Sequence, residues 1–462
     1  MKFKRAFVAG LKRHRAFLTV VPPAALLRLV GIGYGLPAVF NGDEPHHVNV
    51  AMSFGRGSLN PGIFKYPTLW MYVLFAAYAG GFILWSGAGL LGSAQEFGEL
   101  FVWRHSGFYL AGRLLSTAFS LGGLWWVYRA AGLAGGRPSG VLAAALLAVS
   151  APMIESAHSV KPDCLMFFFA AWSWWQAMAY LELGGCRRLL LCAAAVGLSV
   201  SSQYTAAPLA VLVPVVWLAR RRLRPGRADG AGVLAAALAV VGLLFLAGTP
   251  FALLDAPTFA RDVRDSWAAH GAGQAMTAGW RPLFNLMGFS ASWPLGAVVL
   301  SAGIVRLGRR SPAHALCLLL PCAATVLFFS RQAVGGNARY LYSVFPAVAI
   351  LSALGVRTLV GRGGVFPVGI RLRWVVFLLL LLPGARASWS FDRELLLPDT
   401  RTLASLWVGE NLPAGTRILS DHEADAPRIA MSRDFALHLY ELMKASGHPR
   451  RRYYQLMASG HP

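Results

Sequence analysis

Long apolar runs separated by short polar segments dominate the chain, and this pattern sets the first expectation about its fold. A helix of about 20 apolar residues is long enough to cross a bilayer. Runs of spanning or near-spanning length cover about 16–39, 67–91, 107–130, 139–157, 164–183, 189–205, 205–219, 231–250, 286–306, 313–330, 340–359 and 374–390. The pattern therefore predicts an all-α polytopic membrane protein with twelve candidate spans.

Composition and charge agree with a membrane protein. The chain of 462 residues is 56% hydrophobic and only 14% charged, with a mean hydropathy of +0.52, which is too apolar for a soluble protein. The net charge of +23 comes entirely from residues 1–390, which carry 34 basic and 11 acidic side chains, while residues 391–462 carry nine of each. Basic loops are typical of the cytoplasmic side of membrane proteins, so we expect membrane lipid and not nucleic acid as a partner.

The basic loops also predict an orientation. They are the N-terminus, YRAAGLAGGRP, GGCRR, ARRRLRPGRADG, RLGRRSPAH and VRTLVGRGGVFPVGIRLR. All of them can face the cytoplasm only if one early run does not cross. We assign this role to 67–91, which contains Gly80, Gly81 and Gly87, as a re-entrant or juxtamembrane hairpin. The prediction is about eleven crossings of a bacterial inner (plasma) membrane, with the N-terminus inside and the C-terminus outside.

Several polar segments then share the extracytoplasmic face: 40–66, 92–106, 155–163, 251–285 and 331–339. The chain divides into a transmembrane catalytic domain, residues 1–390, and a small extracytoplasmic segment, residues 391–462. In this tail Leu403, Leu406 and Trp407 form one helical face, and Arg417 begins a predicted strand. We therefore expect a small α/β fragment outside the membrane.

The most polar outer segment, FNGDEPHHVNVAMSFGRGSLNPGIFKYPT, begins at Phe40. Asp43 and Glu44 open a predicted helix with a proline in its first turn, so Asp43 could serve only as a helix cap. Asp163, in HSVKPD, is a second carboxylate at the same boundary and could likewise be a cap. Two acids that converge from different helices suit deprotonation of an acceptor nucleophile, with the second acid orienting the acceptor or holding a cation. We include Glu44 among the candidate catalytic residues, as a support for the position of Asp43.

Cations are predicted on the same face. Five cations on this face could stabilise a phosphate leaving group: Lys65, Lys161, Arg104, Arg331 and Arg339. Arg339 and Tyr340 could instead anchor the chain at the membrane interface.

Three histidines complete the candidate chemistry. His46, His47 and His158, together with Lys161, are candidate substrate-binding residues. The adjacent pair His46 and His47 points to different sides of a helix, which is poor spacing for a metal, so no metal site is predicted. A divalent cation stays open as a cofactor.

Six segments in order resemble the GT-C superfamily of membrane glycosyltransferases, and within it the branch of protein O-mannosyltransferases and aminoarabinose transferases. They are GDEPHH, FKYPTLW, LAGRLLSTAFSLGGLWWVYRAAG, HSVKPDCLMFFF, NARYLYSVFPAVAI and DTRTLASLWVGENLPAGTRIL. The resemblance implies a sugar donor carried on polyprenyl phosphate and an inverting transfer to an extracytoplasmic protein, lipid or glycan. It also implies that Asp43 is the catalytic base, that Asp163 is the acid of the second outer loop, and that Arg339 and Tyr340 lie near the donor phosphate.

Two other interpretations stay open. A secondary transporter or lipid flippase would carry charged or helix-breaking residues at the midplane of paired spans, whereas the ionisable residues here cluster in outer loops. A protein that keeps the fold without activity is the third possibility, and the intact pair of Asp43 and Glu44 argues against it.

Overall fold

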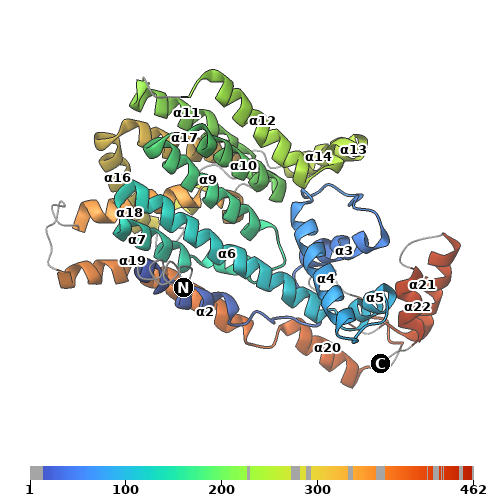
Figure 1. Cartoon of the computed structure of the whole chain (residues 1–462). Coiled ribbons are helices and arrows are strands. Elements are labelled where there is room, and N and C mark those ends of the chain that lie inside the picture. Colours follow the sequence, from blue (N-terminus) through green and yellow to red (C-terminus); the bar gives the residue numbers. More distant parts are fainter. Residues whose placement is uncertain are drawn as a thin grey trace.

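The computed structural model describes residues 14–225, 229–271, 281–287, 293–330, 337–360, 370–413, 415–419, 426–427, 429, 431–446 and 451–459. Within these ranges the chain is helical or irregular and contains no strand (Figure 1). The predicted all-α membrane part is thereby confirmed. Every apolar run found in the sequence contains at least one helix.

The helices of the first half are α2 (Val21–Leu29), α3 (Glu44–Ser53), η1 (Phe54–Arg56), α4 (Leu69–Gly87), α5 (Ala94–Trp103), α6 (Ser106–Gly135), α7 (Arg137–Ala148), α8 (Ala151–Ala157), α9 (Asp163–Leu183), α10 (Cys186–Ser202), η2 (Tyr204–Val211) and α11 (Leu212–Leu223). Those of the second half are α12 (Ala231–Gly248), α13 (Phe251–Leu254), α14 (Ala256–Gly271), α15 (Arg281–Met287), α16 (Trp293–Arg310), α17 (Pro312–Ser330), η4 (Ala338–Leu341), α18 (Phe345–Val360), α19 (Ile370–Leu395), α20 (Thr400–Asn411), α21 (Arg433–Ala445) and α22 (Arg451–Ser459).

Four described segments are long and apolar enough to cross a membrane: α4, α12, α17 and the stretch Val375–Asn411. The pair α7 and α8, bent by 64°, makes a fifth if it counts as one span. The chain is an integral membrane protein by this measure, but the predicted count of eleven crossings is not confirmed.

The prediction that residues 67–91 form a hairpin is wrong. One continuous helix, α4, runs through Gly80 and Gly81 and ends at Gly87. Glycine lowers helix propensity by about 1 kcal/mol relative to alanine, which a long apolar helix tolerates without breaking. Whether α4 crosses the membrane stays a prediction.

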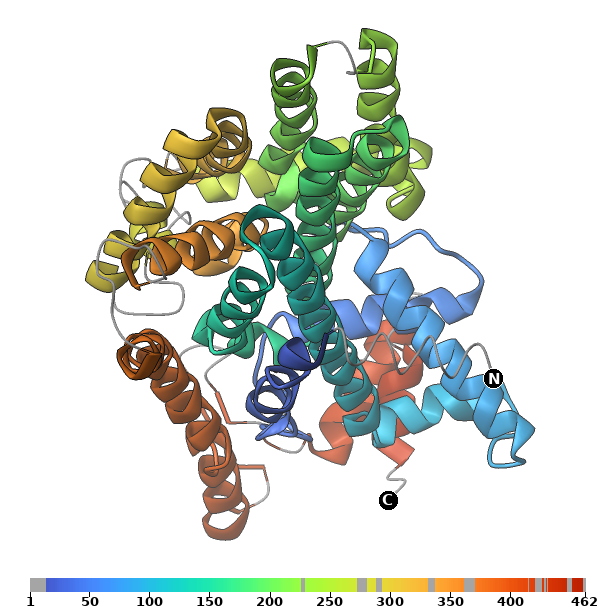
Figure 2. The ribbon, with the colours of Figure 1, turned by 60° about the vertical axis from the view of Figure 1, so that its left-hand side comes forward.

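The core is built around α6 and α9, which pack along each other. Figures 1 and 2 place α10, α11, α12 and α17 on one side of this pair and α2 and α19 on the other. Helices α16 and α18 touch through their backbones, because a Cβ on Gly303 would collide with the carbonyl oxygen of Leu351 and one on Gly355 with that of Val299. Small residues at such crossings are typical of helix packing in membranes.

A break between α7 and α8 shapes the segment that leads into α9. Pro152 lies in the first turn of α8, and Val149 and Ser150 separate the two helices. The buried guanidinium of Arg28 donates to the carbonyl oxygens of Leu147 and Ala148, at 3.3 and 3.0 Å. Arg28 therefore satisfies carbonyl groups at the end of α7, and the chain turns to deliver residues 158–163 beside α3.

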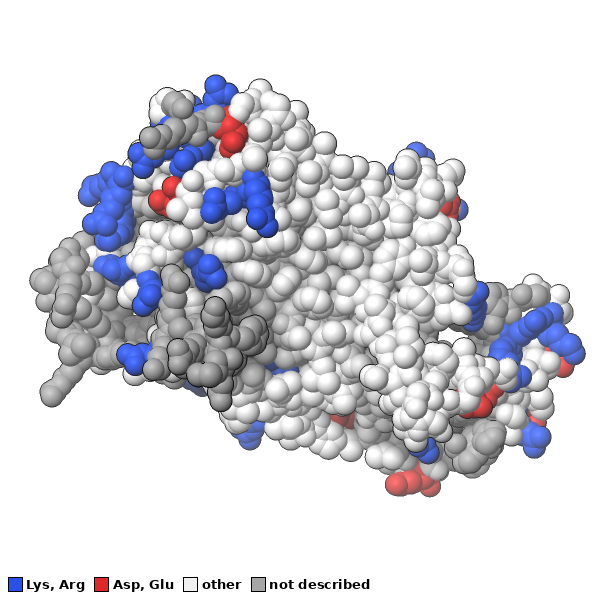
Figure 3. Space-filling model, in the orientation of Figure 1, with Lys and Arg blue, Asp and Glu red and all other residues white. Residues whose placement is uncertain are grey.

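Charge divides the molecule into two ends. Figure 3 shows Lys and Arg gathered where α11 leads to α12 and α16 meets α17, followed by a broad band without charge. Helices α3, α5, α14, α20, α21 and α22 lie at the other end. This separation agrees with the predicted sorting of basic loops from polar outer segments.

The tail is helical where it is described. Helix α19 continues to Leu395, past the expected boundary at residue 390. Residues 416–419, where a strand was expected, are irregular, so the α/β fragment is not confirmed. The tail contacts the rest of the chain through an ion pair of Arg452 with Glu99 of α5, at 2.9 Å. The two-domain division itself stays a prediction.

Candidate active site around Asp43

The candidate site begins at the first turn of α3. Asn41 accepts a hydrogen bond from the backbone N–H of Asp43 at 3.2 Å and donates one to the hydroxyl of Ser159 at 3.1 Å. Helix α3 starts at Glu44 with a proline in its first turn, as expected. The Asp43 carboxylate makes no capping hydrogen bond, so helix capping does not explain this residue.

The Asp43 carboxylate instead meets side chains from three other segments. Arg339 donates a hydrogen bond to it at 3.1 Å, the Lys161 ammonium lies at 3.4 Å, and the Tyr66 hydroxyl donates at 3.3 Å. The side chain of Asp43 is 27% exposed, which leaves it open to an incoming molecule. The structure thus brings together Asp43, Lys161 and Arg339 as the sequence suggested, and adds Tyr66. Arg331, another predicted cation, lies outside the described residues.

These neighbours control the charge of Asp43. Partial burial by itself raises the pKa of its carboxyl group. The attraction of Lys161 and Arg339, the hydrogen bond from Arg339 and a smaller effect of Lys65 outweigh that burial and lower the pKa to about 2. Asp43 is therefore a carboxylate at neutral pH, in the protonation state that a general base needs.

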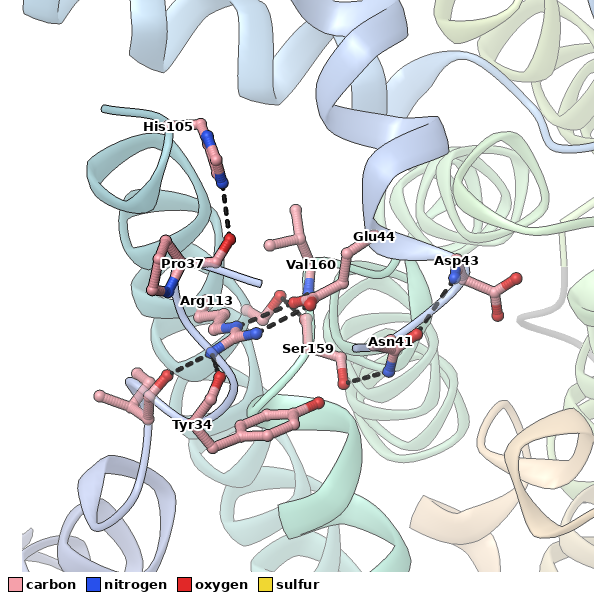
Figure 4. A network of polar contacts seen from close by, with 11 residues as sticks. Tyr34, Pro37, Asn41, Asp43, Glu44, His105, Arg113, Ser159 and Val160 are labelled. Carbon is pink, nitrogen blue, oxygen red and sulfur yellow. Dashed lines mark hydrogen bonds and ion pairs between the residues drawn. The ribbon is translucent and has the colours of Figure 1, made fainter. Parts of the chain in front are cut away.

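Glu44 has a different environment from its neighbour (Figure 4). Its buried carboxylate accepts two hydrogen bonds from Arg113, at 2.9 and 2.8 Å, and one from the backbone N–H of Val160 at 2.8 Å. Arg113 also donates to the carbonyl oxygens of Ile32 and Tyr34, both at 2.8 Å. Glu44 therefore ties the start of α3 to α6 and to the segment that carries Lys161, while the Asp43 side chain points away from this network.

Arg113 was not among the candidates from sequence. It lies inside the apolar run 107–130, and a charged residue within such a run is a signal of a structural or functional role. Its partner could not be identified from spacing, because Glu44 is 69 residues away.

Unpaired buried polar atoms concentrate next to Asp43. Fourteen buried side-chain N or O atoms in the described part of the chain have no hydrogen-bond partner. Six of them belong to His46, His47, Asp163, Gln203 and Arg339. An unsatisfied buried polar group costs about 1–3 kcal/mol. This concentration indicates a site that a polar ligand or water completes.

The sequence places His46 and His47 on different sides of a helix, but in the structure both rings lie against Tyr66. Their rings are 5.3 Å apart, and the ring of Tyr66 is 4.7 Å from His47 and 5.6 Å from His46. Burial lowers the pKa of both, and nearby Lys65 lowers that of His46 further. Both rings are neutral at pH 7, so they can exchange hydrogen bonds with hydroxyl groups but add no positive charge. Among the described residues, no three His, Cys, Asp or Glu side chains are grouped to hold a metal.

The loop that carries Lys65 and Tyr66 is held in place by residues that were not among the candidates from sequence. Asp262 of α14 accepts a hydrogen bond from the backbone N–H of Phe64 at 2.9 Å, and Tyr204 donates to the carbonyl oxygen of Phe64 at 3.3 Å. Two helices from distant parts of the chain therefore position the loop.

Two predicted site residues are placed differently. His158 is buried away from the Asp43 carboxylate, with its ring nitrogens 2.9 and 2.8 Å from the carbonyl oxygens of Ile154 and Val30. The ring of Tyr340 stacks on Phe329, and the Arg339 guanidinium lies 5.4 Å from the centre of the Tyr340 ring. Their roles toward a substrate stay predictions.

Comparison with known proteins places this geometry in context. A family model of dolichyl-phosphate-mannose-protein mannosyltransferases matches residues 106–247. The chain is similar to the structure of ArnT from Cupriavidus metallidurans bound to undecaprenyl phosphate, with a TM-score of 0.56, 15% identity, and coverage of 97% of this chain and 75% of that chain. No curated protein matches the sequence at a significant level.

A second similar structure is the archaeal oligosaccharyltransferase AglB from Archaeoglobus fulgidus, in complex with an inhibitory peptide and a dolichol-phosphate. Its TM-score is 0.52 at 14% identity, and the match covers 88% of this chain and 59% of that chain. The chain spans about three fifths of the length of this oligosaccharyltransferase. At such identities the structural matches show the fold. Together with the family model they confirm the predicted resemblance to GT-C membrane glycosyltransferases, and neither comparison favours a transporter.

Proposed function

We propose that this chain, a membrane glycosyltransferase of GT-C type, moves a sugar from a polyprenyl-phosphate donor to an extracytoplasmic hydroxyl acceptor, with inversion at the anomeric carbon. The observation that carries the proposal is the contact of Asp43 with Arg339 and Lys161. It combines an ionised, partly exposed carboxylate with two cations at an incompletely satisfied polar site. The two similar structures are complexes with undecaprenyl phosphate and with a dolichol-phosphate, which supports a lipid phosphate at such a site.

In the proposed reaction the acceptor oxygen attacks the anomeric carbon while its proton passes to the Asp43 carboxylate. The bond from the anomeric carbon to the phosphate oxygen breaks, and its electron pair stays on the phosphate. Arg339, with Lys161 and Lys65, stabilises the charge that develops there. A phosphate is a competent leaving group, so one base and several cations suffice.

Donor binding also makes Asp43 a stronger base, because the donor phosphate and the Asp43 carboxylate share the same two cations. In the free protein Arg339 and Lys161 hold the pKa of Asp43 at about 2, where a carboxylate is a weak base. A donor phosphate that engages the same two cations weakens their hold on Asp43 and adds negative charge nearby. The pKa of Asp43 then rises, and the base becomes stronger only when the donor is in place.

The other predicted residues have supporting roles in this scheme. Asp163, buried beside Gln203 with one carboxylate oxygen unpaired, orients the acceptor. The neutral rings of His46 and His47 exchange hydrogen bonds with sugar or acceptor hydroxyls. Glu44 acts through Arg113 and the backbone of Val160, so it is a positioning residue.

The test is transfer by the purified protein with undecaprenyl-phosphate-linked sugars as donors, followed as release of undecaprenyl phosphate. Asp43→Asn removes the base with almost no change in volume and should lower turnover roughly 100-fold or more, while donor binding is kept. Arg339→Gln should chiefly weaken donor binding. Full transfer by Asp43→Asn would overturn the assignment of the base.

A further inference from the structure

A second concentration of cations lies at the opposite, basic end of the molecule. A cavity of about 380 Å³ opens there between the turn from α6 to α7, the end of α16, the start of α17 and the last turns of α18. Three arginines line it: Arg306 and Arg310 from α16 and Arg357 from α18. The cavity has the size of a small-ligand site.

The charge of these arginines is not balanced by the protein around them. Arg357 donates to the carbonyl oxygen of Gly135 and to the hydroxyl of Ser139. Among the residues that the structure describes, Arg306 and Arg310 have no hydrogen bond or ion pair. One carboxylate, Glu182, lies among the lining residues.

That carboxylate is already engaged. Glu182 contacts the ring of His314 at 3.0 Å, and its side chain is 46% exposed. The parts of the chain that are not described contain only three acids, Asp421, Glu423 and Asp425, and all of them belong to the tail. Asp229, which precedes α12 at this end, does not line the cavity, so Glu182 is the one carboxylate among the described lining residues.

Two helix ends add to the positive potential. Helix α17 begins at Pro312, next to the lining residues Ser311 and His314, and α7 begins at Arg137, next to the lining residue Gly136. The first turns of helices favour anions, because their N–H groups are unpaired and the helix dipole is positive there.

We propose that this cavity binds a phosphate group, supplied either by an anionic lipid headgroup of the adjacent leaflet or by a soluble phosphate. Guanidinium groups bind phosphate oxygens in pairs of parallel hydrogen bonds, and three of them around one cavity outweigh a single engaged carboxylate. The site is separate from Asp43 and belongs to the other end of the protein, so it does not depend on the function proposed above.

The competing explanation is that these arginines are ordinary surface cations held in the headgroup region. Arg309 provides the matched control, because it lies on the same helix, is exposed, and does not line the cavity. The test compares Arg306→Gln combined with Arg310→Gln against Arg309→Gln. All variants carry Arg339→Gln, so that phosphate binding by the cations around Asp43 is weakened and contributes equally in each of them.

Two measurements separate the sources of phosphate. Equilibrium dialysis with radiolabelled inorganic phosphate in neutral detergent reports soluble anions. Native mass spectrometry of protein taken from nanodiscs of equal parts phosphatidylglycerol and phosphatidylcholine reports retained lipid. We expect the combined variant to lose about tenfold or more in the affinity or occupancy of at least one probe, and the Arg309 variant to match its parent.

Loss confined to phosphatidylglycerol would assign the site to a lipid headgroup, and loss confined to inorganic phosphate would assign it to a soluble ligand. If the combined variant and Arg309→Gln bind both probes equally well, the proposal is overturned. A monodisperse profile of each variant in size-exclusion chromatography, required before binding is measured, excludes unfolding as the cause of a loss.

Discussion

The buried ion pair of Glu44 and Arg113 allows a quantitative prediction about stability. Glu44→Gln removes the charge and replaces one carboxylate oxygen by an amide that faces the Arg113 guanidinium. Arg113 is then a buried cation without a counter-charge, and removing one partner of such a pair costs about 3–5 kcal/mol. Because the amide oxygen can still accept from Val160, we expect a loss near the lower limit, about 3 kcal/mol.

Arg113→Met leaves the complementary defect, a buried carboxylate held only by the Val160 N–H. When both residues are changed, neither buried charge is left behind. The double variant should therefore be more stable than the sum of the two single losses predicts, by about 2 kcal/mol or more. The matched control is Glu155→Gln, an exposed acid on α8, which should cost no more than about 0.5 kcal/mol.

Thermal unfolding of the purified protein, followed by fluorescence size-exclusion at a fixed scan rate, measures the effect. At roughly 2 °C per kcal/mol or somewhat less for a long chain, Glu44→Gln should lower Tm by about 4–6 °C. If Glu44→Gln lowers Tm no more than Glu155→Gln does, the ion pair does not hold the site together. The same conclusion follows if the stability losses of Glu44→Gln and Arg113→Met simply add in the double variant.

Three further outcomes are expected. The ion pairs place the folded-state pKa of Asp43 at about 2, below the ordinary 3.8. The contribution of Asp43 to stability is therefore complete above about pH 4 and is lost as the pH falls toward 2. The difference in Tm between the wild type and Asp43→Asn should disappear between these pH values, and a difference that does not change with pH would contradict the ion pairs. Because Arg339 and Lys161 already occupy the Asp43 carboxylate, a chelator such as EDTA should leave transfer unchanged, whereas loss of activity restored by a divalent cation would show a metal requirement. A membrane-impermeant maleimide should label the exposed Cys186 only from the cytoplasmic side, and the cysteine introduced by Ser58→Cys only from the extracytoplasmic side. Labelling of both cysteines from one side would refute the topology.

Much of the helical fold could be predicted from the sequence, because apolar runs and helices coincide along the chain. The hairpin expected at α4 rested on the parity of the basic loops and on Gly80 and Gly81. A Cβ at either glycine would meet no atom within 4 Å, so neither glycine marks a close contact, and the helix continues through both. The strand expected at Arg417 rested on a short local pattern, and such patterns do not decide between strand and irregular structure without a neighbouring strand.

Several residues of the candidate site could be predicted from the sequence, but the contacts between them could not. Polar residues between apolar runs identified Asp43, Lys161 and Arg339 as sharing one face. Spacing carries no information about contacts across many helices, and the opposite roles of Asp43 and Glu44 follow from which way each side chain points. Asp262 was missed for the same reason, since an acid on an amphipathic helix resembles any solvated residue until its backbone partner at Phe64 is known.

The sequence separations within the site have a consequence for biosynthesis. Asp43 emerges from the ribosome early, Lys161 follows after about a third of the chain, and Arg339 is made 296 residues after the carboxylate that it contacts. Insertion into the membrane is therefore complete for most helices before the last cation reaches Asp43. A nascent chain that has not yet inserted the segment before α18 holds Asp43 without Arg339, so the donor site that we propose gains its full set of cations only after that segment is in place.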